Sequence, residues 1–162
     1  MILTDFKTDP LEWQIVNDGV MGGISQSQME VLENGIGRFS GIVSLENNGG
    51  FASIRAPLSK KPNKPFQKIQ LKVKGDGQRY SFRIKTDDYF DGVTYKNDFT
   101  TQKGEWSIIK LAIKDFIPVW RGRQLTNIKP LDPLKMRQVG LLISDKQAGN
   151  FALLVDWIKL IE

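Results

Sequence analysis

The chain has 162 residues, 40% of them hydrophobic and 25% charged, with no Cys, no His and a formal net charge of +5. This composition is typical of a folded globular protein, and we predict one domain that spans residues 1–162. The absence of Cys excludes disulfides, zinc–thiolate sites and cysteine nucleophiles, and the absence of His removes the commonest general base and metal ligand. We therefore predict a non-catalytic protein without a metal or cofactor.

The first segment predicted to be functional is residues 16–25, which read Val-Asn-Asp-Gly-Val-Met-Gly-Gly-Ile-Ser. Asn and Asp bond their own backbone in turns, and Gly accepts a positive φ at no steric cost. The plain interpretation is a tight loop that leads the chain into a sheet. The alternative is a recognition loop that presents Asn17, Asp18, Met21 and Ser25 to a ligand.

Apolar and polar residues alternate with a period of two along most of the remaining chain, which predicts β-strands. The clearest series are residues 39–45, 69–73, 80–84 and 151–158, and the last of them reads as buried on both faces. We predict that Trp13, Trp106 and Trp157, which lie in or beside strands, fill the core.

Turn signals separate these strands. Asn-Asn-Gly-Gly at 47–50 precedes a strand at 51–55, and Gly-Asp-Gly at 75–77 joins the strands 69–74 and 79–86. Asp-Gly is the strongest short-range signal of a hairpin, so we expect these last two strands to pair. About eight to ten short strands at this spacing predict an antiparallel β-sandwich or barrel.

Residues 59–74 contain six lysines and no acidic residue. Prolines nearby indicate an extended loop, and Phe66 is the only aromatic residue in this segment, so a platform for stacked bases is not expected. We interpret the lysines as a solvated face that protects a strand edge, and we predict that nucleic acid is not a partner.

A second group of candidate binding residues comes from different parts of the chain. Its members are Arg55, Asp76, Tyr80, Arg83, Trp120 and Arg121. With Asp18 they would line a polar concave face, where a guanidinium binds carboxylates, phosphates or sugar hydroxyls. Trp and Arg in the segment 117–123, predicted not to be a strand, are also the residue types that dominate binding hot spots. The alternative is that each arginine pairs with a local aspartate and that Trp120 is buried.

Two groupings of acidic residues are the candidates for a calcium site. They are Asp87, Asp88 and Asp91 in one and Asp145 and Asp156 in the other. Carboxylates suit calcium, but loop carboxylates are more often simply solvated, and we predict no metal ion here.

The first residues contain no basic region followed by an apolar stretch, so we predict no signal peptide. No apolar run approaches the roughly 20 residues that a membrane-spanning helix requires. We expect a soluble, cytoplasmic protein that does not span a membrane.

Several motifs occur in one order along the chain. They are Trp13, Asn-Asp-Gly-Val-Met-Gly-Gly at 17–23, Leu-Glu-Asn-Asn-Gly-Gly-Phe-Ala-Ser-Ile-Arg at 45–55, Lys-Gly-Asp-Gly-Gln-Arg-Tyr at 74–80, Arg-Gly-Arg at 121–123 and Asp-Lys-Gln-Ala-Gly-Asn-Phe at 145–151. In this combination the chain resembles the complex I intermediate-associated protein 30 family. The resemblance implies an all-β fold, a galactose-binding-like jelly roll, and brings no catalytic residues. Mitochondrial members of the family resemble chaperones that hold intermediates of respiratory complex I.

The residues and the resemblance together predict a binding or assembly module whose partner is a protein, such as a respiratory complex I intermediate. The alternative is a module that binds a carbohydrate or another small ligand on the concave face of the jelly roll. Without the transit peptide of the mitochondrial members, the chain looks like the bare domain found in bacterial members.

Overall fold

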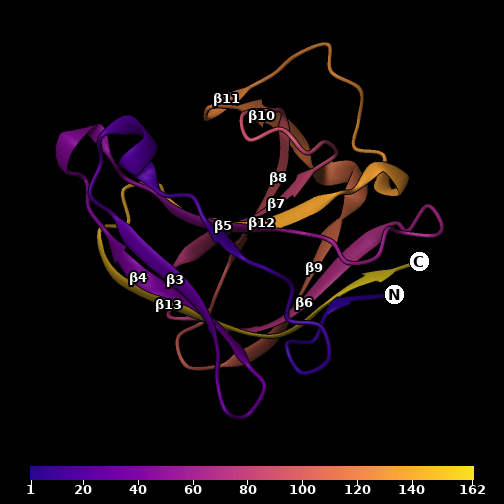
Figure 1. Cartoon of the computed structure of the whole chain (residues 1–162), viewed down its shortest axis with the longest axis horizontal. Coiled ribbons are helices and arrows are strands. Elements are labelled where there is room, and N and C mark those ends of the chain that lie inside the picture. The colour runs from indigo at the N-terminus through magenta and orange to yellow at the C-terminus, as the bar shows by residue number, and fades with distance from the viewer.

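The computed structural model describes the backbone of residues 1–162 and the side chains of all of them except Val20, Met21 and Asn48. Two antiparallel sheets pack face to face as a β-sandwich (Figure 1). The predicted antiparallel sandwich is confirmed. In the described part of the chain, no helix has the length and apolar character needed to cross a bilayer.

The first sheet, which we call sheet A, has the strand order β3-β4-β13-β6-β9, with β1 beside β13. Its strands are β1 (Ile2–Thr4), β3 (Gln26–Val31), β4 (Gly37–Val43), β6 (Lys68–Lys74), β9 (Trp106–Ala112) and β13 (Gly149–Ile161). The amino group of Met1 donates a hydrogen bond to the carbonyl oxygen of Leu160 at 2.9 Å, so the two ends of the chain lie side by side (Figure 1).

The second sheet, sheet B, has the strand order β11-β10-β8-β7-β12-β5-β2. Its strands are β2 (Gln14–Ile15), β5 (Ala52–Pro57), β7 (Arg79–Lys85), β8 (Thr94–Thr100), β10 (Ile117–Trp120), β11 (Arg123–Gln124) and β12 (Gln138–Ile143). Short 3-10 helices connect some of the strands: η1 (Asp18–Met21), η2 (Glu46–Asn48), η3 (Ile113–Asp115) and η4 (Pro133–Lys135).

The core between the sheets is filled by the apolar series that the alternation identifies. Phe39, Leu71, Phe82 and Leu153 are completely buried. Phe39 also packs edge to face against Phe151, with ring centroids 4.9 Å apart. Burial of such side chains contributes about 1.5–3 kcal/mol each and is the main force that holds the sheets together.

The hairpin predicted at residues 75–77 is wrong. β6 pairs with β13 and β9 in sheet A, whereas β7 pairs with β8 and β12 in sheet B. The turn instead carries the chain from one sheet to the other. The positive φ of Gly77, +90°, suits both kinds of turn, so the local signal cannot distinguish them.

The prediction that three tryptophans fill the core is also wrong. Trp13 is only partly buried, Trp106 is 41% exposed, and Trp157 is half buried with Lys159 Nζ 4.1 Å from the ring centroid. The register of β13 shifts between Val155 and Trp157, so the face that points into the core changes there. The other face of this strand is half buried rather than buried.

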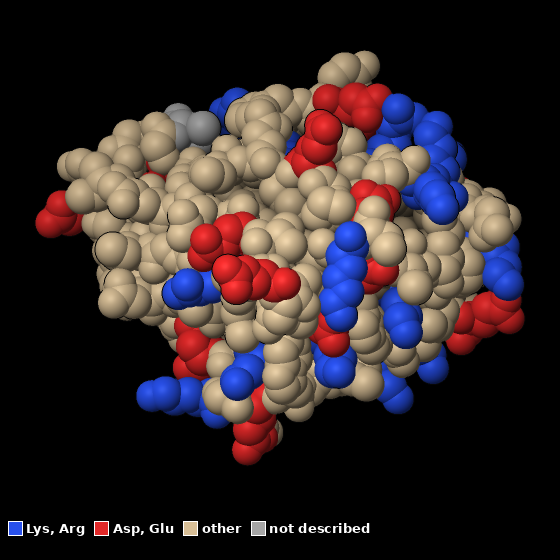
Figure 2. Space-filling model, turned by 60° about the horizontal axis from the view of Figure 1, so that its bottom comes forward, with Lys and Arg blue, Asp and Glu red and all other residues tan. Residues whose placement is uncertain are grey.

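The lysines of the basic segment are distributed over a loop and the outer face of sheet A. Lys72 Nζ lies 3.3 Å from Asp156 Oδ2, and Lys64 forms an ion pair with Glu162. Figure 2, which brings the lower side of Figure 1 forward, shows acidic side chains interspersed among the basic ones. The basic run in the sequence therefore does not produce a uniformly basic surface on this face.

Candidate functional site

A groove with a volume of about 900 Å³ lies on the outer face of sheet B. Its floor comes from β5, β12 and β7, which are neighbours in the sheet (Figure 1). Its walls come from residues 45–51, residues 90–94 and the hairpin of β10 and β11. Because side chains alternate along a strand, β5 directs Ala52 and Ile54 into the core and Ser53 and Arg55 into the groove.

Three basic side chains on the floor form what we call the cationic cluster: Arg55, Arg83 and Lys85. Gly140 of β12 lies opposite Arg55 on one side and opposite Arg83 on the other. Lys85 is two residues further along β7 and therefore shares a face with Arg83. Two of the predicted site residues, Arg55 and Arg83, are thus brought together by the pairing of three strands.

The members of the cluster have few acceptors. Arg55 Nη1 donates to the carbonyl oxygen of Phe90 at 2.9 Å, and its guanidinium carbon lies 4.8 Å from the Phe90 ring centroid. Arg83 Nε donates to Ser81 Oγ at 3.3 Å. Lys85 is 4% exposed, and its Nζ makes no hydrogen bond to any described residue. Burial lowers the pKa of all three groups, because each loses hydration in its charged form.

Arg121 lies at the rim of the groove and is ion-paired. Its Nη2 and Nε lie 2.6 and 3.2 Å from Asp91 Oδ2, which raises the pKa of Arg121 and lowers that of Asp91. Its guanidinium carbon also lies 4.7 Å from the ring centroid of Trp120, which is 38% exposed. The predicted pairing of arginine with a local aspartate therefore holds for Arg121, and Trp120 is not buried.

The segment 117–123 is an edge hairpin, so the prediction that it is not a strand is wrong. β10 pairs with β8 on one side and with β11 on the other. Arg121 and Gly122 connect β10 to β11, with φ values of +49° and +79°. Two successive positive φ values are typical of the tight turns that fit the twist of a hairpin.

The acidic residues near the groove are mostly bound to other cations. Asp88 Oδ2 lies 2.7 Å from Arg137 Nη2, and Asp145 Oδ2 lies 3.1 Å from Arg79 Nη2. Among the side chains that the structure describes, no three acidic groups come together in a way that could hold a metal ion.

The opening loop places its polar residues inside the fold. Asp18 is completely buried and accepts hydrogen bonds from Ser25 Oγ at 2.5 Å and from the Gly50 N–H at 2.8 Å. Burial opposes ionisation of Asp18, but these donors outweigh it and hold its pKa below the ordinary value. Asn17 Oδ1 accepts from the Ser53 N–H at 3.0 Å. Asp18 and Ser25 are thus not on a surface that a ligand reaches, and the side chain of Met21 lies outside the described residues.

Asp76 and Tyr80 are not part of the groove either. Tyr80 is 1% exposed, and its hydroxyl donates to Asp76 Oδ2 at 3.0 Å at the corner where the chain changes sheets. Burial, followed by the charge of Asp76, raises the pKa of Tyr80. The prediction that both residues line the concave face with the arginines is corrected by this placement.

Sequence reasoning missed other groove residues, among them Lys85, Phe90 and Gly140. Lys85 carried a usable signal in the sequence. It lies two residues after Arg83, with a core residue between them, and therefore belongs on the same strand face as Arg83. Phe90 lies in a loop and Gly140 within a buried strand, and neither had a local pattern that indicated a binding role.

The two antiparallel sheets form a β-sandwich of the jelly-roll type, with the groove on the outer face of sheet B. The family 11 carbohydrate-binding module of Clostridium thermocellum, solved with a β-1,3-1,4-mixed-linked tetrasaccharide, has the same fold. It matches with a TM-score of 0.74 and 19% sequence identity over 99% of this chain and 94% of its own. The family model described as complex I intermediate-associated protein 30 matches residues 4–155, and the chain belongs to this family.

Two curated relatives carry the family name. The mitochondrial protein of Drosophila melanogaster is 25% identical over 183 residues, which cover 98% of this chain and 62% of the relative. The mitochondrial protein of Mus musculus is 25% identical over 174 residues, which cover 94% of this chain and 52% of the relative. The chain therefore spans between half and two thirds of these relatives. Because both are mitochondrial, the prediction of a cytoplasmic location is wrong.

Proposed function

We propose that residues 1–162 form one non-catalytic binding module that holds a protein partner in the groove of sheet B. The partner we propose is an intermediate in the assembly of respiratory complex I. Membership of a family named for association with such an intermediate supports the partner class. The observation that carries the proposal is the groove itself, a large recess that combines apolar residues with the cationic cluster.

Several features support binding rather than catalysis. The chain has neither His nor Cys, so proton transfer and nucleophilic attack would depend on carboxylates, Lys or Tyr. Near the groove, Asp88, Asp91 and Asp145 are held in ion pairs with arginines instead of facing one another across the recess. A carboxylate that is ion-paired in this way connects two segments of the fold.

A second candidate is a carbohydrate ligand in the same groove. It is favoured by the likeness to the family 11 carbohydrate-binding module, whose structure contains a tetrasaccharide. Arginines in the groove and Trp120 beside Arg121 would supply donors and an aromatic face. The protein partner is the better-supported candidate, because the family match extends over residues 4–155 whereas the likeness to the carbohydrate-binding module is one of fold.

Site-specific cross-linking tests the proposal. Phe90, at the groove, is 55% exposed and is replaced by the photoreactive residue p-benzoylphenylalanine in cells that produce the chain naturally. The same replacement at Trp106, which is 41% exposed on sheet A, is the matched control. We expect adducts with complex I subunits from position 90 and few from position 106. Equal adducts from both positions, or no protein adduct together with binding of the mixed-linked tetrasaccharide, would overturn it.

A further inference from the structure

The floor of the groove leaves a gap between two guanidinium groups. Gly140 lies between Arg55 and Arg83 in the sheet, and it has no side chain to separate them. A Cβ at Gly140 would lie 2.7 Å from the carbonyl oxygen of Ile54, so any larger residue would force the backbone to shift. The sequence thus keeps an open space over Gly140 with basic groups on both sides.

The charge of the cationic cluster is poorly compensated. Within the described part of the chain, neither Arg55 nor Arg83 forms an ion pair, although eight ion pairs occur outside the cluster. The carboxylate closest to the cluster is that of Asp87, whose Oδ1 is 3.5 Å from Lys85 Nζ, a separation too long for a strong charge-assisted hydrogen bond. Asp91, Asp98 and Asp145 are each bound to another basic residue.

Among the described residues, Lys85 has Asp87 as a distant ion-pair partner but lacks a hydrogen bond. Its side chain is buried, lines the groove and makes no hydrogen bond with the described residues. An ammonium group that loses water and gains only a carboxylate beyond hydrogen-bond strength destabilises the folded state. Burial correspondingly lowers the pKa of Lys85. An anionic group from outside would supply the missing acceptor.

Part of the remaining lining is apolar, and this part limits which anion fits. Val16, Phe51 and Leu142 line the groove beside the cationic cluster, and Val16 and Leu142 are each 8% exposed. Free phosphate would leave this apolar surface wet, and an acidic sugar would cover it with hydroxyls. An acidic side chain flanked by apolar side chains matches both the cationic cluster and the apolar residues of the groove.

We infer that the groove recognises an acidic peptide segment with apolar neighbours, whose carboxylate binds Arg83, Lys85 and Arg55 above Gly140. This inference rests on the proposed function, because it names the chemistry of the segment by which the protein partner is held. The main-chain carbonyl oxygen of residue 90, which p-benzoylphenylalanine retains, positions Arg55 for this role.

The test uses the purified chain and two matched synthetic peptides, acetyl-Leu-Glu-Leu-amide and acetyl-Leu-Gln-Leu-amide, followed by nitrogen–hydrogen NMR spectra. We expect the Glu peptide to bind at least about tenfold more tightly than its Gln twin, the range for a charge-assisted hydrogen bond. The shifts should centre on Arg55, Arg83 and Lys85. Inorganic phosphate and glucuronate serve as probes for other anion sources and should bind more weakly. Equal affinity for the two peptides, or tighter binding of phosphate or glucuronate, would contradict the inference.

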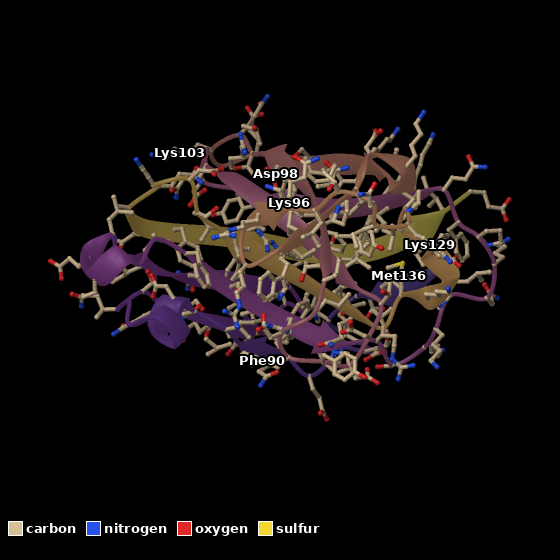
Figure 3. The ribbon with its side chains drawn as sticks, turned by 90° about the horizontal axis from the view of Figure 1, so that it is seen from above. Phe90, Lys96, Asp98, Lys103, Lys129 and Met136 are labelled. Atoms are coloured by element: carbon tan, nitrogen blue, oxygen red, sulfur yellow. The ribbon has the colours of Figure 1, made fainter. Side chains whose placement is uncertain are left out.

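Two substitutions separate recognition from folding. Lys85→Met removes the buried charge at similar volume and should weaken the preference for the Glu peptide while leaving the protein folded. Lys96→Met is the control, because Lys96 Nζ is bound to Asp98 Oδ2 at 3.1 Å and does not line the groove. Figure 3 shows Lys96 beside Asp98 and apart from Phe90. A Lys85→Met variant that retains the full preference would overturn the role of Lys85.

The cross-linking experiment distinguishes this inference from the proposed function. If complex I subunits cross-link at position 90 with equal yield in the wild type and in Lys85→Met, the proposed function stands and the acidic-peptide inference fails. If the Glu peptide binds selectively but no protein cross-links at position 90, the inference stands and the proposed function fails.

Discussion

Asp18 and Ser25 are bound to each other at two points, with the Ser25 hydroxyl 2.5 Å from Asp18 Oδ2 and the Ser25 N–H 2.9 Å from Asp18 Oδ1. Ser25 directly precedes β3 of sheet A, and Gly50, which donates to the same carboxylate at 2.8 Å, lies two residues before β5 of sheet B. One buried carboxylate therefore ties the two sheets together at one end of the sandwich. Asp18 and Ser25 of the opening loop therefore serve the fold.

Replacement of Asp18 by Asn should lower the free energy of unfolding by about 3 kcal/mol at pH 7, because an amide cannot accept from all the donors that face it. Urea titration of both proteins measures this difference. Since the folded protein holds the Asp18 pKa below 3.8, the stabilisation is complete above that value and is lost as the pH falls through the lowered pKa. The difference between variant and wild type should therefore shrink below about pH 4. A difference of the same size at pH 3 and pH 7 would contradict this account.

The fold could be predicted from the sequence because its core strands alternate strictly. The series around Phe39, Leu71 and Phe82 is buried as the alternation indicates. The pairing of strands could not be predicted in the same way. The turn at 75–77 looks locally like a hairpin, and only the partners of β6 and β7 show that it changes sheets. The irregularity of β13 before Trp157 likewise depends on pairing with two neighbours.

The candidate site could be predicted only in part. Arg55 and Arg83 were identifiable from their positions on strands, since each alternates with core residues. Their proximity depends on β12, which inserts between β5 and β7 although it follows both by more than fifty residues. Residue type alone was misleading for Asp18 and Tyr80, because a polar atom looks the same in sequence whether it faces water or a buried partner.

The glycines around Asp18 give a second prediction. A Cβ at Gly23 would lie 2.4 Å from Asp18 Cγ, so Gly23→Ala should displace the carboxylate and lower the free energy of unfolding by about 2 kcal/mol, as overpacking of a core does. Gly19→Ala is the control, because a Cβ there meets no atom within 4 Å. Thermal melts of the two variants should differ clearly. Equal melting temperatures would show that the packing around Asp18 is loose.

Lys85 gives a prediction about stability that does not need a ligand. Lys85→Met should raise the free energy of unfolding by about 1 kcal/mol at pH 7, because the wild type keeps a buried ammonium without a hydrogen bond. As the pH rises toward 10.5, the ordinary lysine value, Lys85 loses its proton at its lowered folded-state pKa and the wild type is relieved of this cost. The advantage of the variant should therefore decrease with rising pH.

Lys96→Met is the comparison in the same assay. It removes an ion pair with Asp98 and should leave the free energy of unfolding unchanged or lower it by up to about 1 kcal/mol. If Lys85→Met were destabilising at pH 7 while Lys96→Met was neutral, the ion pair of Lys85 with Asp87 would be more important than its 3.5 Å separation indicates.

The corner formed by Asp76 and Tyr80 provides the last prediction. Asp76 Oδ2 accepts from the Tyr80 hydroxyl at 3.0 Å, from Gln78 Nε2 at 2.7 Å and from the Ala152 N–H at 2.9 Å. Tyr80→Phe removes one of these donors and keeps the ring in the core, so it should cost about 1 kcal/mol in the free energy of unfolding. Asp76→Ala leaves the other donors without an acceptor, including a buried hydroxyl, and should cost about 2–3 kcal/mol. In the double variant the loss should be smaller than the sum of the two, since both changes remove the same hydrogen bond. Additive losses would mean that this bond contributes nothing, and unchanged stability in all three variants would mean that the corner does not stabilise the fold.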